Sequence, residues 1–306
     1  MGAPRPDNPG SPAPGAGGAP DGRRASEGQG PSAVSAPPLL DVRGISIAFG
    51  GLKAVQNFSL AIPRGGLYGL IGPNGAGKTT CFNLLTGVYR TQTGSITLDG
   101  LRVDGLKPHQ IAAAGLSRTF QNIRLFGDLT VLDNVRLGCH VRGRHSLWGT
   151  LTRSSSYVGQ ERAIRERAAH LLDTLALGDR ADEQARNLPY GDQRRLEIAR
   201  ALATEPRVLL LDEPAAGMNP QETKGLARMI RSIRDAFDLT ILLIEHDMGL
   251  VMEICEQITV LDYGVTIAVG TPREVQGNPK VIEAYLGLPA DEEPAPRPAG
   301  QEAPRA

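Results

Sequence analysis

The stretch that decides the fold is Gly72-Pro73-Asn74-Gly75-Ala76-Gly77-Lys78-Thr79, which fits the pattern G-x-x-x-x-G-K-[ST] at every fixed position. Its glycines allow backbone amides to converge on phosphate oxygens, and the positive N-terminal end of the following helix points at them. Lys78 can reach the β- and γ-phosphates, and the Thr79 hydroxyl suits Mg²⁺. The predicted nucleotide contacts of this phosphate loop are Gly72, Pro73, Asn74, Gly75, Ala76, Gly77, Lys78, Thr79 and Thr80.

The surroundings of the phosphate loop favour a nucleotide site over a chance match. A chance match occurs in on the order of 1% of chains with this glycine content. Here an apolar, β-prone run, Leu67–Ile71, precedes the motif, and a helix-prone run follows it to about Thr86. This strand–loop–helix order is the context in which the motif binds phosphate. We therefore predict a site for a nucleoside triphosphate.

A second motif supplies two carboxylates. The apolar run Val208–Leu211 predicts a buried strand, and Asp212 and Glu213 follow it directly. Such a strand places its acidic end at the carboxyl edge of the sheet, beside the phosphate loop. Asp212 would hold Mg²⁺ through water, and Glu213 would polarise the attacking water as general base. The alternative is a solvated acidic turn before Pro214, which the presence of the phosphate loop disfavours.

The order of segments predicts an α/β fold. Short β-prone runs separated by glycine or proline occupy residues 39–43, 45–49, 55–62, 66–71 and 94–98. The last third alternates helices at 192–204, 220–236 and 248–255 with strands at 208–211, 240–244 and 258–261. The strands near 208 and 240 are apolar throughout, as parallel strands covered on both faces are.

The middle of the chain is predicted to be mostly helical, over about residues 115–188, after a short helix that starts at Pro108. Val131–Leu137 and Glu161–Ala176 show apolar residues at helical spacing. Between them, about 138–158 is rich in Gly, Arg and Ser and reads as a loop or insertion.

Composition gives the chain no strong electrostatic preference. Of its 306 residues 41% are hydrophobic, and the formal net charge is zero. There is therefore no global case for binding nucleic acid or an anionic membrane surface. Residues 1–38 and 289–306 are rich in Pro and Ala and poor in large apolar side chains, so we expect two disordered tails.

The cysteines and the hydropathy indicate a cytoplasmic protein. Cys81, Cys139 and Cys255 are odd in number and widely spaced, which argues against a disulfide framework. Cys139 is near His140 and His145, but no second cysteine is close, so a loop is preferred to a metal site. No apolar run approaches the roughly 20 residues that a membrane span needs, and the N-terminus lacks the apolar stretch of a signal peptide.

Further elements surround the two motifs in a set order. They are Phe49; Gln121 in Arg118-Thr119-Phe120-Gln121; the segment Leu188-Pro189-Tyr190-Gly191-Asp192-Gln193; Pro206; Ala216-Gly217-Met218-Asn219; and His246 after a predicted strand. A lone Gln, or a His after a strand, is more often structural than functional. In this order and spacing the elements resemble the ATP-binding-cassette (ABC) family over about residues 39–288.

The resemblance implies both a fold and a set of roles. The fold is a P-loop NTPase core with a mixed sheet, an antiparallel β subdomain and an inserted α-helical subdomain at about 115–188. Gln121 would contact the metal and water and sense the membrane partner, His246 would contact the γ-phosphate, and Phe49 would stack on adenine. Tyr190 and Gly191 belong to the signature segment (188–193), which contacts the ATP of a second subunit.

Two positions depart from the family pattern. The signature usually reads Leu-Ser-Gly-Gly-Gln, and its Ser donates a hydrogen bond to the γ-phosphate held by the opposite subunit. That position is Pro189, which offers neither a hydroxyl nor a backbone N–H. What remains is Gly191 and the dipole of the helix that follows. The D-loop aspartate is replaced by Asn219. We therefore expect the nucleotide site completed by this signature to be weak, which favours a heterodimer with a second ATPase subunit.

The resemblance narrows to the ATP-binding subunits of bacterial branched-chain amino acid importers. It rests on residues 118–126, 188–200, 212–220, 245–248 and 281–287. It implies a peripheral protein on the cytoplasmic face of the bacterial inner membrane. Its partners would be two membrane permeases, a second ATPase subunit and, indirectly, a solute-binding protein. Relatives that move urea, short amides or other amino acids, and lipopolysaccharide-export ATPases, share parts of the pattern.

The mechanism implied by the family is closure of two subunits on two ATP molecules, with reopening after hydrolysis at Glu213. A rival hypothesis is a soluble cassette ATPase of DNA repair or of the ribosome, but the chain lacks a long heptad run, a second cassette and a basic linker. A module that binds ATP without cleaving it is a third hypothesis. The presence of Glu213 and His246 argues against it, whereas Pro189 keeps it open.

Overall fold

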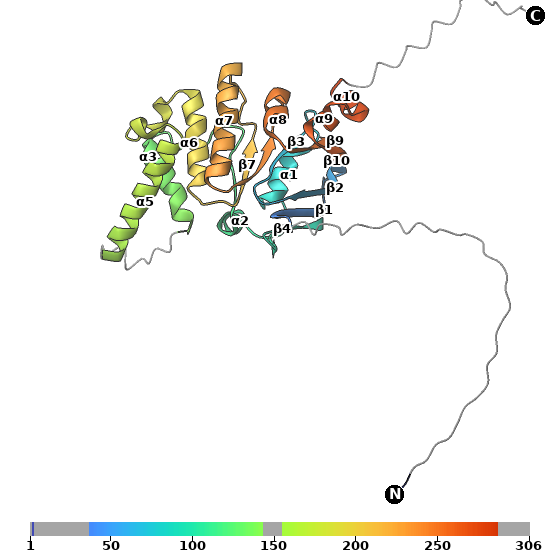
Figure 1. Cartoon of the computed structure of the whole chain (residues 1–306), viewed down its shortest axis with the longest axis horizontal. Coiled ribbons are helices and arrows are strands. Elements are labelled where there is room, and N and C mark those ends of the chain that lie inside the picture. The colour runs from blue at the N-terminus through green and yellow to red at the C-terminus, as the bar shows by residue number, and fades with distance from the viewer. Residues whose placement is uncertain (1, 3–36, 143–154, 287–306) are drawn as a thin grey trace, which may run out of the picture. The chain divides into compact units, whose positions relative to one another are not determined.

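The computed structural model describes Gly2, residues 37–142 and residues 155–286. The chain divides into two units, residues 1–36 and 37–306, and all helices and strands discussed here belong to the second (Figure 1). The predicted tails therefore lie outside the described residues, apart from Gly2, Pro37 and Pro38.

An antiparallel sheet forms the first part of the second unit. Its strands are β1 (Leu40–Phe49), β2 (Leu52–Ile62), β4 (Thr93–Leu98) and β5 (Leu101–Arg102), in the order β2-β1-β4-β5. All three neighbouring pairs are antiparallel. The two runs predicted at 39–43 and 45–49 are one strand, β1, whose register shifts around Gly44. Gly44 has a φ of 58°, a value that suits glycine at a bulge.

A six-stranded mixed sheet forms the centre. Its order is β10 (Val265–Gly270), β9 (Gln257–Asp262), β3 (Leu67–Ile71), β8 (Thr240–Ile244), β7 (Val208–Asp212) and β6 (Leu116–Arg118). Every neighbouring pair is parallel except β10–β9. Every residue of β7 and β8 is buried, as predicted for strands covered on both faces.

Alternation along the central strands divides the core in two. Leu209 and Leu211 pack with helices α7 (Pro220–Ala236) and α8 (Met248–Ile254) on one face of the mixed sheet. Leu210, pointing the other way, packs with α1 (Lys78–Leu85) and with the antiparallel sheet. Both faces of the sheet are therefore closed, and the carboxyl edge of the parallel strands is left to carry polar residues.

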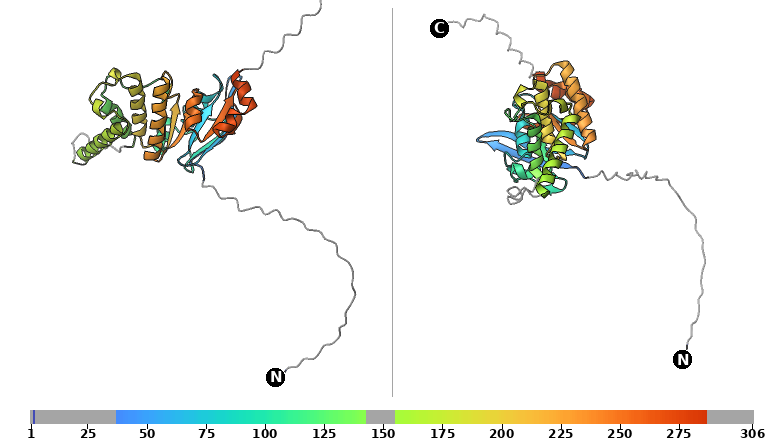
Figure 2. Two further views of the ribbon diagram at one scale, coloured as in Figure 1. Left: turned by 45° about the horizontal axis from the view of Figure 1, so that its top comes forward. Right: turned by 90° about the vertical axis from the view of Figure 1, so that its left-hand side faces the viewer.

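The helical region consists of α3 (Val131–Cys139), α5 (Ser155–Thr174) and α6 (Tyr190–Leu202), which pack together at one end of the unit (Figure 2). Short 3₁₀ turns, η1 (His140–Arg142), η2 (Gly178–Arg180) and η3 (Ala185–Asn187), join or extend them. Among the described residues, the remaining helices are α2 (Pro108–Ala114), α9 (Pro272–Gln276) and α10 (Pro279–Leu286).

Several boundaries differ from the sequence-based prediction. The segment predicted to be mostly helical begins with a strand, β6, because Leu116–Arg118 pairs in parallel with β7; three residues are too short to show a period. The predicted loop at 138–158 contains the end of α3, η1 and the start of α5, and residues 143–154 lie outside the described ranges. Strand β10 and helices α9 and α10 were not predicted.

Candidate nucleotide site

The phosphate loop joins β3 to α1. Gly77 is the N-cap of α1 with a φ of 101°, and a Cβ there would stand 2.5 Å from the Ala54 carbonyl oxygen. Only glycine suits both constraints. The Lys78 ammonium donates hydrogen bonds to the carbonyl oxygens of Gly72 (2.7 Å) and Pro73 (3.0 Å). The loop thus holds its own lysine in place.

Electrostatics link Lys78 to the acidic pair. Burial lowers the pKa of Lys78, and the negative charges of Glu213 and Asp212 oppose that shift. The three charged groups of the two motifs therefore share one environment. Thr79 is exposed in the first turn of α1, and Thr80 next to it is half-buried.

Glu213 occupies a strained backbone position. Its φ of 47° lies in the left-handed region, which non-glycine residues seldom adopt and which is often found at functional sites. Its backbone N–H donates to the Ile244 carbonyl (2.9 Å), so the end of β7 is pinned to the end of β8. The residue that follows β7 is therefore held at the carboxyl ends of both strands.

Three predicted residues from distant parts of the chain meet at the Glu213 carboxylate. The Gln121 amide Nε2 donates to Glu213 Oε2 at 2.7 Å. His246 Nδ1 lies 3.8 Å from the same oxygen, and the His246 side chain is 60% exposed. Gln121, Glu213 and His246 therefore surround one point where a water molecule can be oriented and where a phosphate can approach.

Glu245 is a functional candidate to which the sequence analysis assigned no role. Its side chain is fully buried and accepts hydrogen bonds from the backbone N–H groups of Ala215 (2.6 Å), His246 (3.1 Å) and Asp247 (3.4 Å). Burial raises the pKa of Glu245, and these amides lower it. The carboxylate thus ties the turn after Glu213 to the loop that carries His246. The available signal was a charged residue directly after an apolar strand.

A buried ion pair joins the signature helix to the glutamine loop (118–121). Arg194 and Glu197, both on α6, are 2.8 Å apart with side-chain exposures of 0% and 2%. Arg194 also donates to the carbonyl oxygens of Phe120 (2.8 Å) and Gln121 (2.9 Å). Glu197 accepts from the Phe120 backbone N–H (3.2 Å). The position of Gln121 is therefore coupled to that of α6.

Comparison with known proteins identifies the family. The family model described as ABC transporter matches residues 55–216. The high-affinity branched-chain amino acid transport ATP-binding protein LivG of Salmonella typhimurium is 49% identical, over 82% of this chain and 98% of its own length. The chain belongs to the ABC transporter family. A second model, described as branched-chain amino acid ATP-binding cassette transporter, matches residues 265–290 of this ABC protein.

Further relatives of the ABC protein agree in sequence and fold. The branched-chain amino acid transport ATP-binding protein BraF of Pseudomonas aeruginosa is 46% identical over 82% of this chain and 98% of its own length. The crystal structure of an ATP-binding cassette of an ABC transporter in its ADP conformation is 30% identical, with a TM-score of 0.72, and covers 81% of this chain and 98% of that chain. The predicted fold and the ATPase activity coupled to transport are confirmed.

The signature segment of this ABC protein departs from the family pattern as the sequence indicated. Pro189 is the N-cap of α6, and no side chain caps this helix. The Tyr190 ring lies beside Gly217, 3.6 Å from where a Cβ would stand, and its hydroxyl accepts from Arg194 (3.3 Å). Gly191 is half-buried in the first turn. No side-chain hydroxyl is therefore available at the helix start in the position of the usual serine.

The D-loop and the predicted adenine contact have local partners. Asn219 caps α7, accepting from the backbone N–H groups of Gln221 (2.9 Å) and Glu222 (3.0 Å), a role that Asp can also fill. Phe49 is 45% exposed at the end of β1 and packs edge to face on Tyr89, with ring centroids 5.1 Å apart. Stacking of Phe49 on adenine stays a prediction.

The oxygen donors of the ABC site suit Mg²⁺. The Thr79 hydroxyl and the Asp212 carboxylate are the oxygen ligands that a hard cation prefers. Because Gln121 uses its amide nitrogen toward Glu213, its amide oxygen is left for a metal or for water. Within residues 37–142 and 155–286 no group of three or more His, Cys, Asp or Glu could hold a metal. Mg²⁺ is usually bound by one or two carboxylates together with phosphate and water, and the donor set fits that mode.

No helix in the described part of the chain is long and apolar enough to span a membrane.

Proposed function

We propose that this ATPase drives a bacterial importer of branched-chain amino acids or related small solutes. The observation that carries the proposal is the match of residues 265–290 to the branched-chain amino acid cassette model. Relatives named for branched-chain amino acid transport support it, because they are 46% to 49% identical over 98% of their own length.

The groups around Glu213 support the following catalytic roles. Glu213 accepts a proton from the attacking water as general base, and Gln121 orients that water and the carboxylate. Lys78 leaves its loop carbonyls to pair with the β- and γ-phosphates, and His246 contacts the γ-phosphate. Thr79 and Asp212, with Gln121, would hold Mg²⁺, which when bound would supply positive charge to the phosphate oxygens.

The proposed assembly contains a second ATPase subunit of different sequence. Each ATP lies between the phosphate loop of one subunit and the signature segment of the other. Since Pro189 has no hydroxyl or N–H to donate, the signature segment of this chain binds the γ-phosphate of its partner's ATP weakly. A partner with the usual serine in its signature segment would bind the γ-phosphate of the ATP held by Lys78 more tightly. This difference between the two nucleotide sites favours a heterodimer.

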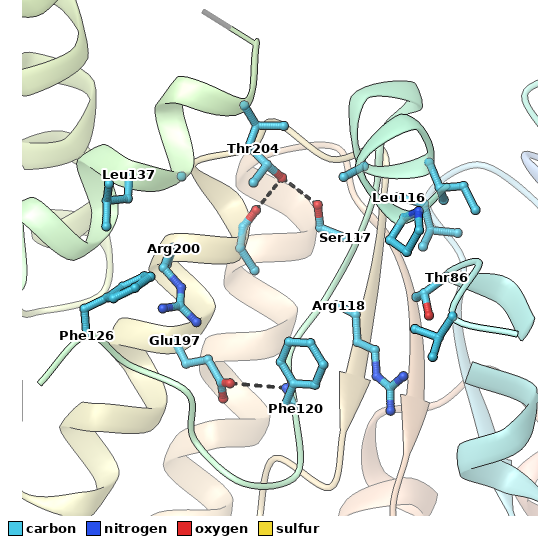
Figure 3. A pocket seen from close by; sticks show the side chains of 17 residues that line it. Thr86, Leu116, Ser117, Arg118, Phe120, Phe126, Leu137, Glu197, Arg200 and Thr204 are labelled. Carbon is cyan, nitrogen blue, oxygen red and sulfur yellow. Dashed lines mark hydrogen bonds between the residues drawn. The ribbon is translucent and has the colours of Figure 1, made fainter. Parts of the chain in front are cut away.

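A pocket of about 450 Å³ fits the contact with a membrane permease. It lies where α2, α3 and α6 approach the glutamine loop, and Phe120, Phe126 and Leu137 line it (Figure 3). Its lining is largely apolar, and Glu197 and Arg200 add charge. A short permease helix with an apolar face would fill it. The pair of permeases places this chain on the cytoplasmic face of the inner membrane, and a solute-binding protein delivers the solute from the other side.

The experiment that tests the proposed solute is uptake by whole cells. A strain that lacks this gene should lose saturable uptake of radiolabelled leucine, isoleucine and valine, and a plasmid copy should restore it, whereas a copy carrying Lys78→Ala should not. Uptake of radiolabelled urea and acetamide is measured in the same strains. Normal amino acid uptake in the deletion strain, together with lost urea uptake, would replace the proposed solute.

A further inference from the structure

One ion pair in the structure involves the residue proposed to hold Mg²⁺. Arg118 ends β6 and Asp212 ends β7, and these strands are parallel neighbours. Arg118 Nη2 lies 2.6 Å from Asp212 Oδ2, with side-chain exposures of 8% and 4%. The contact is short, charge-assisted and almost fully removed from water.

Arg118 is also held by parts of the nucleotide site. Its Nη1 donates to the Asn83 side-chain oxygen on α1 at 2.7 Å. Its guanidinium carbon lies 5.3 Å from the ring centroid of Phe82 and 5.4 Å from that of Phe120, within the range of a cation–π contact. The arginine therefore touches the helix after the phosphate loop, the strand of Asp212 and the residue next to Gln121.

Arg118 neutralises the buried charge of Asp212, but within the described residues one of its own hydrogen-bond donors is left without a partner. A carboxylate buried without a positive partner is expensive, so Asp212 needs a counter-charge whenever no cation is beside it. Yet Arg118 Nε is buried and has no hydrogen-bond partner among the described residues. Arg136 and Arg194 leave their Nε in the same state, so the exchange is inferred from the short, buried contact with Asp212 itself.

We propose that Arg118 is a positioning residue that acts as the internal counter-ion of Asp212 and is exchanged for Mg²⁺ when the nucleotide binds. This inference rests on the proposed role of Asp212 toward Mg²⁺. Arg118 neutralises Asp212 before the metal arrives, so the phosphates enter a site without a bare carboxylate. Two positive charges cannot share one carboxylate without mutual repulsion, so Mg²⁺ weakens the Arg118 contact.

The other side of Arg118 faces the pocket proposed for the permease. Figure 3 shows it among the lining residues, on the same wall as Phe120. A single side chain thus borders both the metal site and the partner pocket. When Arg118 releases Asp212, the wall of that pocket changes. The exchange of Arg118 for Mg²⁺ can therefore alter how the pocket binds the permease.

The test is equilibrium binding of ADP to the full chain, by isothermal titration calorimetry in EDTA and in excess Mg²⁺. ADP avoids hydrolysis and needs no second subunit. The measured quantity is the ratio of Kd in EDTA to Kd in Mg²⁺. Arg118→Gln leaves Asp212 bare in EDTA and removes the competitor of Mg²⁺. Both effects raise the ratio, by roughly tenfold or more, within the range of coupling between adjacent sites. Arg118→Lys, which keeps the charge, should stay within about threefold of the wild type.

A further variant protects the test from misfolding. Arg118→Gln/Asp212→Asn leaves no buried charge unpaired and should bind ADP with nearly equal Kd in EDTA and Mg²⁺. A wild-type ratio near one would contradict the proposed Mg²⁺ role itself. A clear wild-type ratio that Arg118→Gln leaves unchanged would overturn the counter-ion proposal alone. The double variant tests only the Mg²⁺ role of Asp212. If Arg118→Gln fails to fold, the guanidinium NMR signal of Arg118 in the wild type decides, because the exchange predicts that this signal moves when Mg²⁺ is added to the ADP-bound chain, and an unchanged signal overturns the proposal.

Discussion

At the scale of single residues, the site depends on atoms held at the carboxyl edge of a parallel sheet. Glu213 sits in a left-handed backbone conformation, pinned by the hydrogen bond to Ile244. Its carboxylate then receives Gln121 from the glutamine loop at 2.7 Å. The buried Glu245 carboxylate joins the turn at Ala215 to the loop at His246 through hydrogen bonds to their backbone N–H groups. The left-handed backbone at Glu213 and the buried charge of Glu245 are each locally unfavourable, and together they position the Glu213 carboxylate.

Glu213→Gln should abolish turnover while leaving ATP binding intact. The amide cannot take a proton from water, and loss of a general base lowers kcat by roughly 10²- to 10⁴-fold. Phosphate release by the assembled transporter measures the first effect, and ATP titration measures the second. Glu253→Gln, at an exposed carboxylate of α8, is the matched control and should hydrolyse normally. Wild-type hydrolysis by Glu213→Gln would reject Glu213 as the base.

Pro189→Ser should raise ATPase activity if the missing γ-phosphate donor limits turnover. A serine there can also cap α6, since Pro189 already occupies the N-cap position, and a cap of this kind is worth about 1 kcal/mol. ATPase assays of the assembled transporter and urea unfolding of the isolated chain measure the two effects separately. Pro189→Ala, without a hydroxyl, should give neither gain. An unchanged or lower rate with Pro189→Ser would show that this signature is not rate-determining.

At the scale of elements, α6 and the glutamine loop form one mechanical unit. The fully buried Arg194 donates to two loop carbonyls and to Glu197. A movement of the signature helix therefore carries Gln121 with it, toward or away from Glu213. In the proposed assembly, this contact would link closure of the subunits to assembly of the catalytic groups.

Arg194→Met should lower the free energy of unfolding by about 3–5 kcal/mol, because it leaves Glu197 buried without a partner. Arg194→Met/Glu197→Leu should recover at least half of that loss, since it removes the uncompensated charge. Urea unfolding followed by circular dichroism measures both. A double variant no more stable than the single one would show that the pair is not energetically coupled.

At the scale of the whole molecule, the mixed sheet is closed on both faces, and this closure also decides the chemistry of the thiols. Cys81, Cys139 and Cys255 are all buried and free. Burial raises the pKa of Cys81 and of Cys255 to about 12 and raises that of Cys139. Reactive thiolate is therefore scarce at neutral pH.

Native protein at pH 8 should react with iodoacetamide far more slowly than protein in 8 M urea, as buried thiols do. Intact mass spectrometry should count three adducts per chain in urea, one for each free cysteine. Gln160→Cys, at an exposed position of α5, should add one rapidly labelled thiol and so confirm that the reagent is active. Rapid labelling of the native wild type would contradict a closed core.

The sequence by itself determined the α/β class, the phosphate loop, the acidic pair and most central elements, because each leaves a local pattern. Runs such as Val208–Leu211 are apolar from end to end, and the glycines at 72–77 meet a local backbone requirement. It missed β6, whose three residues are strand only because β7 lies beside them.

Only the tertiary structure decided which groups meet. It brought Gln121 and His246 to Glu213, paired Arg118 with Asp212 across two strands, and buried Arg194 beneath the glutamine loop. These contacts join residues up to 94 positions apart, as Arg118 and Asp212 are, and their energies depend on burial and charge that no local pattern encodes. A sequence motif shows which side chains are present, whereas the packing at the carboxyl edge of the sheet determines which charged groups face one another.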